Sequence, residues 1–161
     1  MDKATVCRYM RPRPRLRLGT GRLRPQFKLA DSAQQMVGGF LLAGPFVVTE
    51  EVWVLAGSMS DFQGVLTVIL VGLIGYAALY RADTKRDPDS EQQVAGVPIR
   101  FISLMAVSFG SVTILALVFD APATFLGEGL STLVLVETTF KAISVGSVFS
   151  VVGAATADSV F

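Results

Sequence analysis

Long uncharged apolar runs dominate this chain, and their lengths predict membrane-spanning helices. Ser32–Thr49, Phe62–Tyr80 and Phe101–Phe119 contain no charged residue. Each run has the length, about 17–25 residues, that a helix needs to cross the hydrocarbon core of a bilayer. The runs are apolar on all sides rather than alternating, so they do not predict a membrane barrel. Ser60 and Asp61, directly ahead of the second run, can cap its helix.

A fourth run, from about Leu130 to Ala157, contains Glu137 and Lys141, and its uncharged part is Ala142–Ala157. That part is short for a span unless the helix begins earlier. We expect the whole segment to be the fourth span. The predicted fold is therefore all-α, a four-helix transmembrane bundle. Its membrane domain covers residues 29–161, with helices at about 31–57, 62–80, 99–119 and 130–157.

The composition agrees with a membrane protein and removes several kinds of chemistry. The chain is 52% hydrophobic and 17% charged, whereas an ordinary soluble domain is about 25% charged. There is no histidine, and Cys7 is the only cysteine. Histidine catalysis, zinc sites and internal disulfides are thereby excluded. No nucleophile–base set is visible, so we expect no enzymatic activity, no cofactor and no metal site.

The basic residues are distributed unevenly, and this predicts the orientation. Of the 14 Lys and Arg residues, nine precede the first run and four lie between the second and third runs. The other two connections contain none. Because cytoplasmic loops carry an excess of Lys and Arg, we expect both termini in the cytoplasm and a multi-pass protein in the cell (plasma) membrane.

Residues 1–28 form a basic, Arg- and Pro-rich tail without the apolar core of a signal peptide. We expect the tail to be cytoplasmic and disordered. It is either a solvated segment that enforces the topology or a segment that binds anionic lipid headgroups. Nucleic acid is not the expected partner. The basic residues expected to face lipid are Arg11, Arg13, Arg15 and Arg17.

Four charged residues fall within or beside the predicted spans, where ionisable groups are rare and often functional. With a first helix that ends near Gly57, Glu50 and Glu51 would lie about 10 Å below its outer end, level with Glu137 in the last helix. Lys141 follows Glu137 at the i,i+4 spacing that favours pairing on a helix. These residues predict a proton or cation site near the outer leaflet.

The same residues allow a structural interpretation. The first helix could leave the membrane at Thr49, with Glu50 and Glu51 among the headgroups. Trp53 would then be an interfacial anchor, and Lys141 would extend its side chain outward to the headgroups. In that case the charges form an interfacial structural cluster rather than an ion site.

Small residues predict where the helices pack. They recur every four residues in the last helix, which lets helix backbones approach closely in lipid. Pro45, in the first helix, is expected to kink it. The small residues serve either packing within the bundle or a homo-oligomer, and a channel would need several copies because four helices do not enclose a wide pore. The predicted packing residues are Gly39, Ala43, Pro45, Ala142, Gly146, Ser150 and Ala154.

Two motifs resemble those of a prokaryotic integral-membrane family defined as a domain of unknown function. Thr49-x-Glu51-x-Trp53 ends the Gly-rich first helix, and Glu137 is followed by Lys141 in the last. The resemblance extends over residues 28–157 and implies the four-span architecture. It implies no activity, substrate or cofactor.

The expected function is a small proton- or cation-responsive transporter or channel component that is embedded in the lipid bilayer as a homo-oligomer. The alternative is a non-transporting membrane organiser or accessory subunit that acts through helix packing and its basic tail.

Overall fold

The computed structural model describes residues 29–81, 93–127 and 129–160, and these are mostly helical. The predicted basic tail lies outside the described residues. In the described part, three helices are long and apolar enough to cross a membrane, and a bent helix pair adds a fourth if it counts as one span. The elements are α1 (Leu29–Val47), α2 (Glu50–Ser58), α3 (Asp61–Tyr76), the π-helical turn η1 (Ala77–Arg81), β1 (Gln93–Val94), β2 (Val97–Pro98), α4 (Ile99–Val118), α5 (Ala121–Leu126) and α6 (Thr132–Val160).

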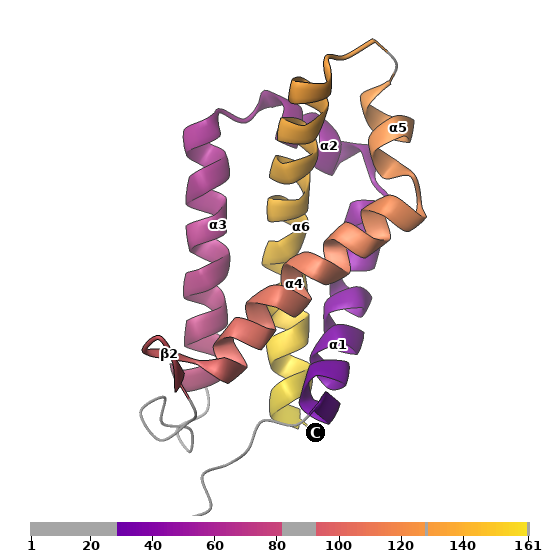
Figure 1. The fold of residues 1–161 in the computed structure, drawn as a ribbon. Coiled ribbons are helices and arrows are strands. Elements are labelled where there is room, and N and C mark those ends of the chain that lie inside the picture. Colours follow the sequence, from indigo (N-terminus) through magenta and orange to yellow (C-terminus); the bar gives the residue numbers. More distant parts are fainter. Residues whose placement is uncertain (1–28, 82–92, 128, 161) are drawn as a thin grey trace, which may run out of the picture.

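The last helix, α6, is the centre of the fold. It packs against α1, α2, α3 and α4, whereas α3 has α6 as its main neighbour (Figure 1). The start of α1, the end of α6 and the β1–β2 hairpin lie together, and we call this the hairpin end. The short helices α2 and α5 lie with the start of α6 at the opposite end, which we call the α5 end.

The predicted spans at 62–80 and 99–119 correspond to α3 with η1 and to α4. The predicted helix over 31–57 is wrong as a single element, because α1 ends at Val47 and α2 leaves it at an angle of 80°. Pro45 lies in the last turn of α1 and is exposed. Thr49 is extended, with φ −107° and ψ 139°, and Glu50 and Glu51 occupy the first turn of α2. Carboxylates are favourable there because they face the positive end of the helix dipole.

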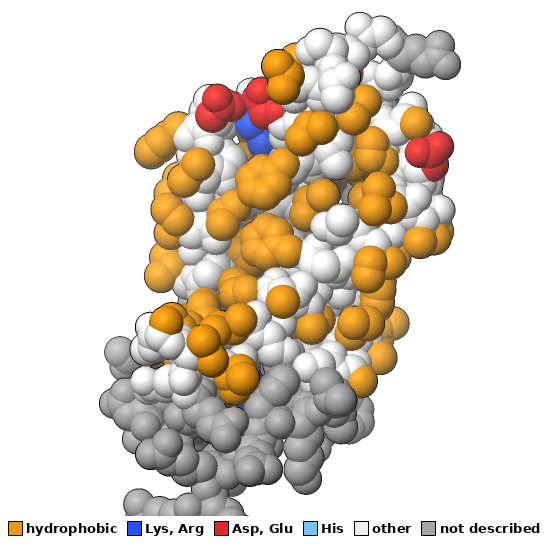
Figure 2. Space-filling view, viewed as in Figure 1, with side chains coloured by type: hydrophobic (Ala, Val, Ile, Leu, Met, Phe, Trp, Pro, Cys, Tyr) orange, Lys and Arg blue, Asp and Glu red, His pale blue; other side chains and the backbone are white. Residues whose placement is uncertain are grey.

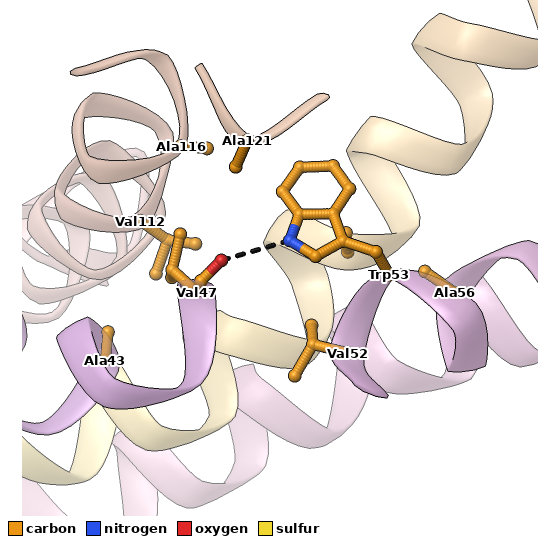
Figure 3. Packing of buried hydrophobic residues seen from close by; sticks show 9 residues of the cluster. Ala43, Val47, Val52, Trp53, Ala56, Val112, Ala116 and Ala121 are labelled. Atoms are coloured by element: carbon orange, nitrogen blue, oxygen red, sulfur yellow. Dashed lines mark hydrogen bonds between the residues drawn. The ribbon is translucent and has the colours of Figure 1, made fainter. Parts of the chain in front are cut away.

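Two side chains donate to backbone carbonyls at the end of α1. The Trp53 indole Nε1 donates to Val47 O at 3.0 Å, and the Thr49 hydroxyl donates to Phe46 O at 2.8 Å. Trp53 is only 2% exposed and packs among Ala43, Ala56 and neighbouring apolar side chains (Figure 3). The expected interfacial anchor is thus a buried residue that holds the bend.

Two glycines allow α1 and α6 to touch through their backbones. A Cβ on Gly153 would lie 2.2 Å from the carbonyl oxygen of Gly38, and a Cβ on Gly38 would lie 2.2 Å from that of Gly153. Of the predicted packing residues, all except Pro45 are buried: Gly39, Ala43, Ala142, Gly146, Ser150 and Ala154. Small residues therefore bring α6 close to its neighbours along most of its length.

This contact predicts the result of a glycine substitution. Gly153→Ala should destabilise the fold, at the upper part of the roughly 1–3 kcal/mol typical of overpacking, because backbone atoms cannot move aside like a side chain. Gly72→Ala in α3 is the matched control, since nothing lies within 4 Å of its Cβ position, and it should be neutral or stabilising. Thermal unfolding in detergent measures both variants. Equal midpoints would contradict the close contact.

Candidate functional site

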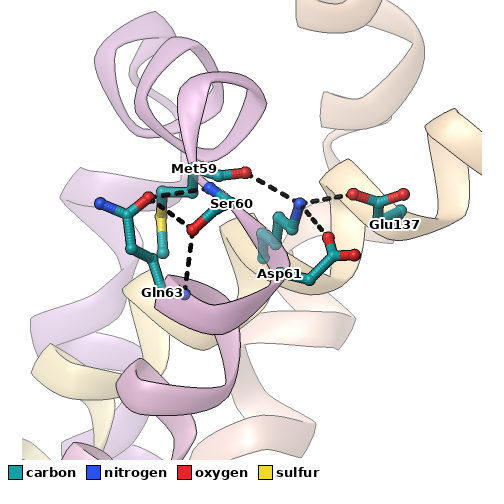
Figure 4. Close-up of polar contacts among 6 residues, drawn as sticks. Met59, Ser60, Asp61, Gln63 and Glu137 are labelled. Carbon is teal, nitrogen blue, oxygen red and sulfur yellow. Dashed lines mark hydrogen bonds and ion pairs between the residues drawn. The ribbon is translucent and has the colours of Figure 1, made fainter.

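The Lys141 ammonium is the centre of a charged cluster at the α5 end. Its Nζ donates to Asp61 Oδ1 at 2.8 Å, to Met59 O at 2.9 Å, and to Glu137 Oε1 (Figure 4). An ammonium has three N–H donors, so these acceptors use all of them. They come from the start of α3, from the segment after α2, and from α6 itself. Lys141 therefore ties α6 to the turn that joins α2 and α3.

Local structure at the start of α3 holds this turn in place. Ser60 Oγ accepts from the backbone N–H of Gln63 at 3.4 Å, and the Ser60 N–H donates to Gln63 Oε1 at 2.8 Å, which completes a capping box. The predicted cap at Ser60 is confirmed. One turn further along α3, Gly64 faces the aliphatic stem of Lys141, and a Cβ there would lie 3.3 Å from its Cγ. The glycine thus leaves room for the lysine to cross α3.

The cluster is buried on its basic side and open on its acidic side. The Lys141 side chain is 8% exposed, whereas those of Asp61 and Glu137 are 83% and 52% exposed. Figure 2 shows acidic and basic atoms together at this end, next to an apolar flank. With two carboxylates and one ammonium, the cluster presents a net negative charge outward.

The structure joins Glu137 to Lys141 but does not join Glu50 or Glu51 to them. Both are exposed and line a hollow on the outer side of α2 with Val54. Within the described part of the chain, neither glutamate side chain makes a hydrogen bond or an ion pair. The expected depth of these residues assumed one helix that continues to about Gly57, and the bend after Val47 removes that basis.

Asp61 pairs with Lys141, whereas we expected Glu50 or Glu51 of the first helix to lie beside this lysine. Sequence reasoning assigned it only a capping position, because no local spacing links it to a lysine so much later in the chain. The sequence does carry one signal for it, since Asp61 is the only acidic residue in a connection that contains no Lys or Arg.

A second polar cluster lies at the hairpin end, and sequence reasoning missed it. Asp158 Oδ1 accepts from Gln35 Nε2 at 3.1 Å, and its Oδ2 lies 3.6 Å from an Arg100 guanidinium nitrogen. Ser103 Oγ donates to Gln35 Oε1 at 3.0 Å and lies 3.1 Å from Ser32 Oγ. The side chain of Asp158 is 1% exposed. Polar side chains therefore connect α1, α4 and α6 at the hairpin end.

Hydroxyl groups lie between the two clusters, and most of them are satisfied by their own helix. In α4, Ser108 donates to Leu104 O at 2.7 Å. In α6, Ser144 donates to the carbonyl of Phe140 at 2.9 Å, and Ser147 bonds in the same way one turn later. Such bonds to the i−4 carbonyl are a common solution for hydroxyls inside a helix.

Ser111 and Ser150 depart from this pattern. Both side chains are buried, and neither hydroxyl has a hydrogen-bond partner among the residues that the structure describes. They come from α4 and α6 and face Gly39 of α1. A Cβ on that glycine would lie 2.8 Å from Ser150 Oγ and 3.1 Å from Ser111 Oγ. Thr139 Oγ1 is also buried without a partner in the described part of the chain, about three turns before Ser150 on the same face of α6.

Comparisons of the chain with protein-family models, curated proteins and solved structures find no match. The resemblance to a family of unknown function therefore stays a prediction. In the described ranges, no group of three or more Asp, Glu, Cys or His residues could hold a metal ion.

The Lys141 cluster predicts a salt-dependent loss of stability. Asp61→Asn should lower the melting temperature in detergent by a few degrees at low salt, because one of three ammonium partners loses its charge. The difference should shrink at high salt, since exposed ion pairs are screened. Glu51→Gln is the matched control. Like Asp61, Glu51 lies in the first turn of a helix, but no lysine of the described ranges pairs with it. A similar salt-dependent loss in both variants would contradict a specific role for Asp61.

Proposed function

We propose that this chain is a small proton- or cation-responsive transporter or channel component, and that α6 carries its polar path. The observation that supports this best is the pair of hydroxyls, Ser111 and Ser150, which are buried without a partner in the described part of the chain. Leaving a buried polar group unsatisfied costs about 1–3 kcal/mol. A water, a proton carrier or a small cation at this point would remove that cost.

The position of the two hydroxyls supports a path. Ser150 lies between Lys141 and Asp158 along α6, and Ser111 of α4 faces the same glycine, Gly39. At a rise of about 1.5 Å per residue, Lys141 and Asp158 are about 26 Å apart along the helix axis, close to the hydrocarbon thickness of about 30 Å. The buried polar side chains along this length are Lys141, Ser144, Ser147, Ser150 and Asp158. Inside membrane bundles, ionisable residues commonly mark ion and proton pathways.

The proposed orientation places the hairpin end in the cytoplasm of the cell and the α5 end outside. The described chain begins and ends at the hairpin end, and the basic loop between the second and third spans joins elements there. The Lys141 cluster then lies near the outer leaflet. Asp61, Glu137 and Lys141 form it, whereas Glu50 and Glu51 stand beside it without direct contact.

The experiment that tests the path is flux in liposomes. Purified protein should carry protons, Na⁺ or K⁺ down an imposed gradient, measured with an enclosed pH- or ion-sensitive dye. The double variant Ser111→Ala/Ser150→Ala should reduce the flux several-fold. Ser144→Ala is the matched control, because its hydroxyl is already bonded to its own helix, and it should keep the flux. Equal flux in all three proteins would contradict the polar path.

The orientation has a separate test that uses Cys7, the only cysteine of the chain. A membrane-impermeant maleimide should label Cys7 in inverted membrane vesicles but not in right-side-out spheroplasts. In the matched variant Cys7→Ser/Ser58→Cys, the new thiol lies at the end of α2 and should label in spheroplasts instead. The opposite pattern would place the basic tail outside the cell.

A second candidate is a membrane organiser or accessory subunit, favoured by the surface of α3. Only 22% of the span that contains α3 and η1 is buried within the chain. Phe62, Leu66, Ile69 and Leu73 are among its exposed apolar side chains. Such a face is available to lipid, to a partner helix or to a second copy of the chain. If the purified protein carries no ion under any imposed gradient, the membrane organiser or accessory subunit is the candidate that remains.

A further inference from the structure

An apolar groove lies at the α5 end, between the end of α4, the helix α5 and the first turns of α6. Its volume is about 500 Å³, and Leu117, Pro122, Phe140 and Ile143 are among the residues that line it. A volume of this size falls within the range of small-molecule sites, about 300–1,000 Å³. Ile143 is two positions beyond Lys141, so the groove lies on the opposite side of α6 from the Lys141 cluster.

The groove has a single charged group among its lining residues, the carboxylate of Asp120. Asp120 is exposed and joins α4 to α5 with a left-handed backbone, φ 50° and ψ 36°. Its side chain does not cap α5, and this side chain has no hydrogen bond or ion pair with the residues that the structure describes. The lining contains no Lys or Arg. The groove is therefore complementary to a positive charge, and the Thr139 hydroxyl is the only other polar side chain among the lining residues.

The position of Asp120 divides the groove into a polar mouth and an apolar body. The α4 span ends at Val118, so the carboxylate lies just beyond the apolar segment. Leu117 and Ile143 belong to the spans themselves. A molecule that fills this groove would place a charged head beside Asp120 and a chain along α4 and α6. Since lipid tails are as apolar as these side chains, selectivity would depend on the charge of the head.

We propose that this groove binds a lipophilic ammonium compound, with a cationic head on the Asp120 carboxylate and one alkyl chain against Leu117, Phe140 and Ile143. This is a binding site separate from the polar path of α6, and it does not depend on transport. An anionic amphiphile could place its chain in the same apolar body, but Asp120 would repel its head. The phosphate of a zwitterionic phospholipid would find no Lys or Arg in the lining.

The chain contains its own reporter for this groove. Trp53 is the only tryptophan, and its ring stacks on Phe125 of α5 with centroids 6.0 Å apart. The same short helix supplies Pro122 to the groove lining. A bromine-labelled molecule in the groove should therefore quench the emission of Trp53.

The test titrates the full chain, in a neutral detergent, with brominated alkyltrimethylammonium and with the brominated alkyl sulfate of equal chain length. The ammonium should quench Trp53 with saturation, and at a concentration at least several-fold lower than the sulfate. Asp120→Asn should remove this preference, and Asn tolerates the left-handed backbone as Asp does. Glu50→Gln is the matched control, because it neutralises an exposed carboxylate at the same end but outside the groove.

Three outcomes would overturn the proposal. One is equal quenching by the two amphiphiles in the unmodified chain, which would show partition into detergent only. Another is a preference that survives Asp120→Asn, which would exclude that carboxylate as the partner. The third is an equal loss in Glu50→Gln, which would assign the preference to the general negative charge of the α5 end. An unchanged emission maximum of Trp53 establishes that each variant is folded.

Discussion

The backbone contact between Gly38 and Gly153 is the constraint on which the other contacts of this fold depend. In a membrane there is no hydrophobic driving force between helices, so close packing has to supply the attraction. With no side chain at either glycine, α1 and α6 lie close enough for Gln35 to reach Asp158 and for Gly39 to meet Ser150. The same packing places α6 at the centre. The helices α3 and α4 pack against other parts of the surface of α6.

The spans were largely predictable because a bilayer imposes a length on them. Uncharged runs of span length predicted α3 with η1 and α4 almost to the residue. The first uncharged run, Ser32–Thr49, also ends close to the end of α1, and the prediction was wrong only where it extended this helix to residue 57. The sequence contained the relevant signal, since Thr49 followed by two glutamates is a typical helix start. The extension of the first helix through both glutamates gave that signal no weight, although the bend after α1 begins there.

The candidate site was predictable only where its geometry is local. Glu137 and Lys141 lie on one helix, and their spacing sets their contact before any tertiary structure forms. The contribution of Asp61 depends on how α2 turns into α3, and that of Asp158 depends on the meeting of α1, α4 and α6. Two residues that meet only in the tertiary structure have no fixed spacing along the chain, so a single sequence does not identify them as a pair. The isolated charges that the sequence does show, Asp61 among them, indicate which residues need a partner but not where it lies.

The polar groups of α6 differ in what satisfies them, and this difference bears on function. Lys141 and Asp158 have partners from other helices, so they tie α6 to its neighbours at two points about 17 residues apart. Ser144 and Ser147 are satisfied by their own helix and need nothing from outside it. Ser150 has the same helical carbonyls nearby, yet its hydroxyl has no partner in the described part of the chain and lies close to Gly39, as does that of Ser111. A Cβ at Gly39 would lie 2.8 Å from the Ser150 hydroxyl oxygen and 3.1 Å from that of Ser111, so the glycine leaves the space that these hydroxyls occupy. The polar path proposed above therefore rests on these two hydroxyls, because those of Ser144 and Ser147 are already satisfied within α6.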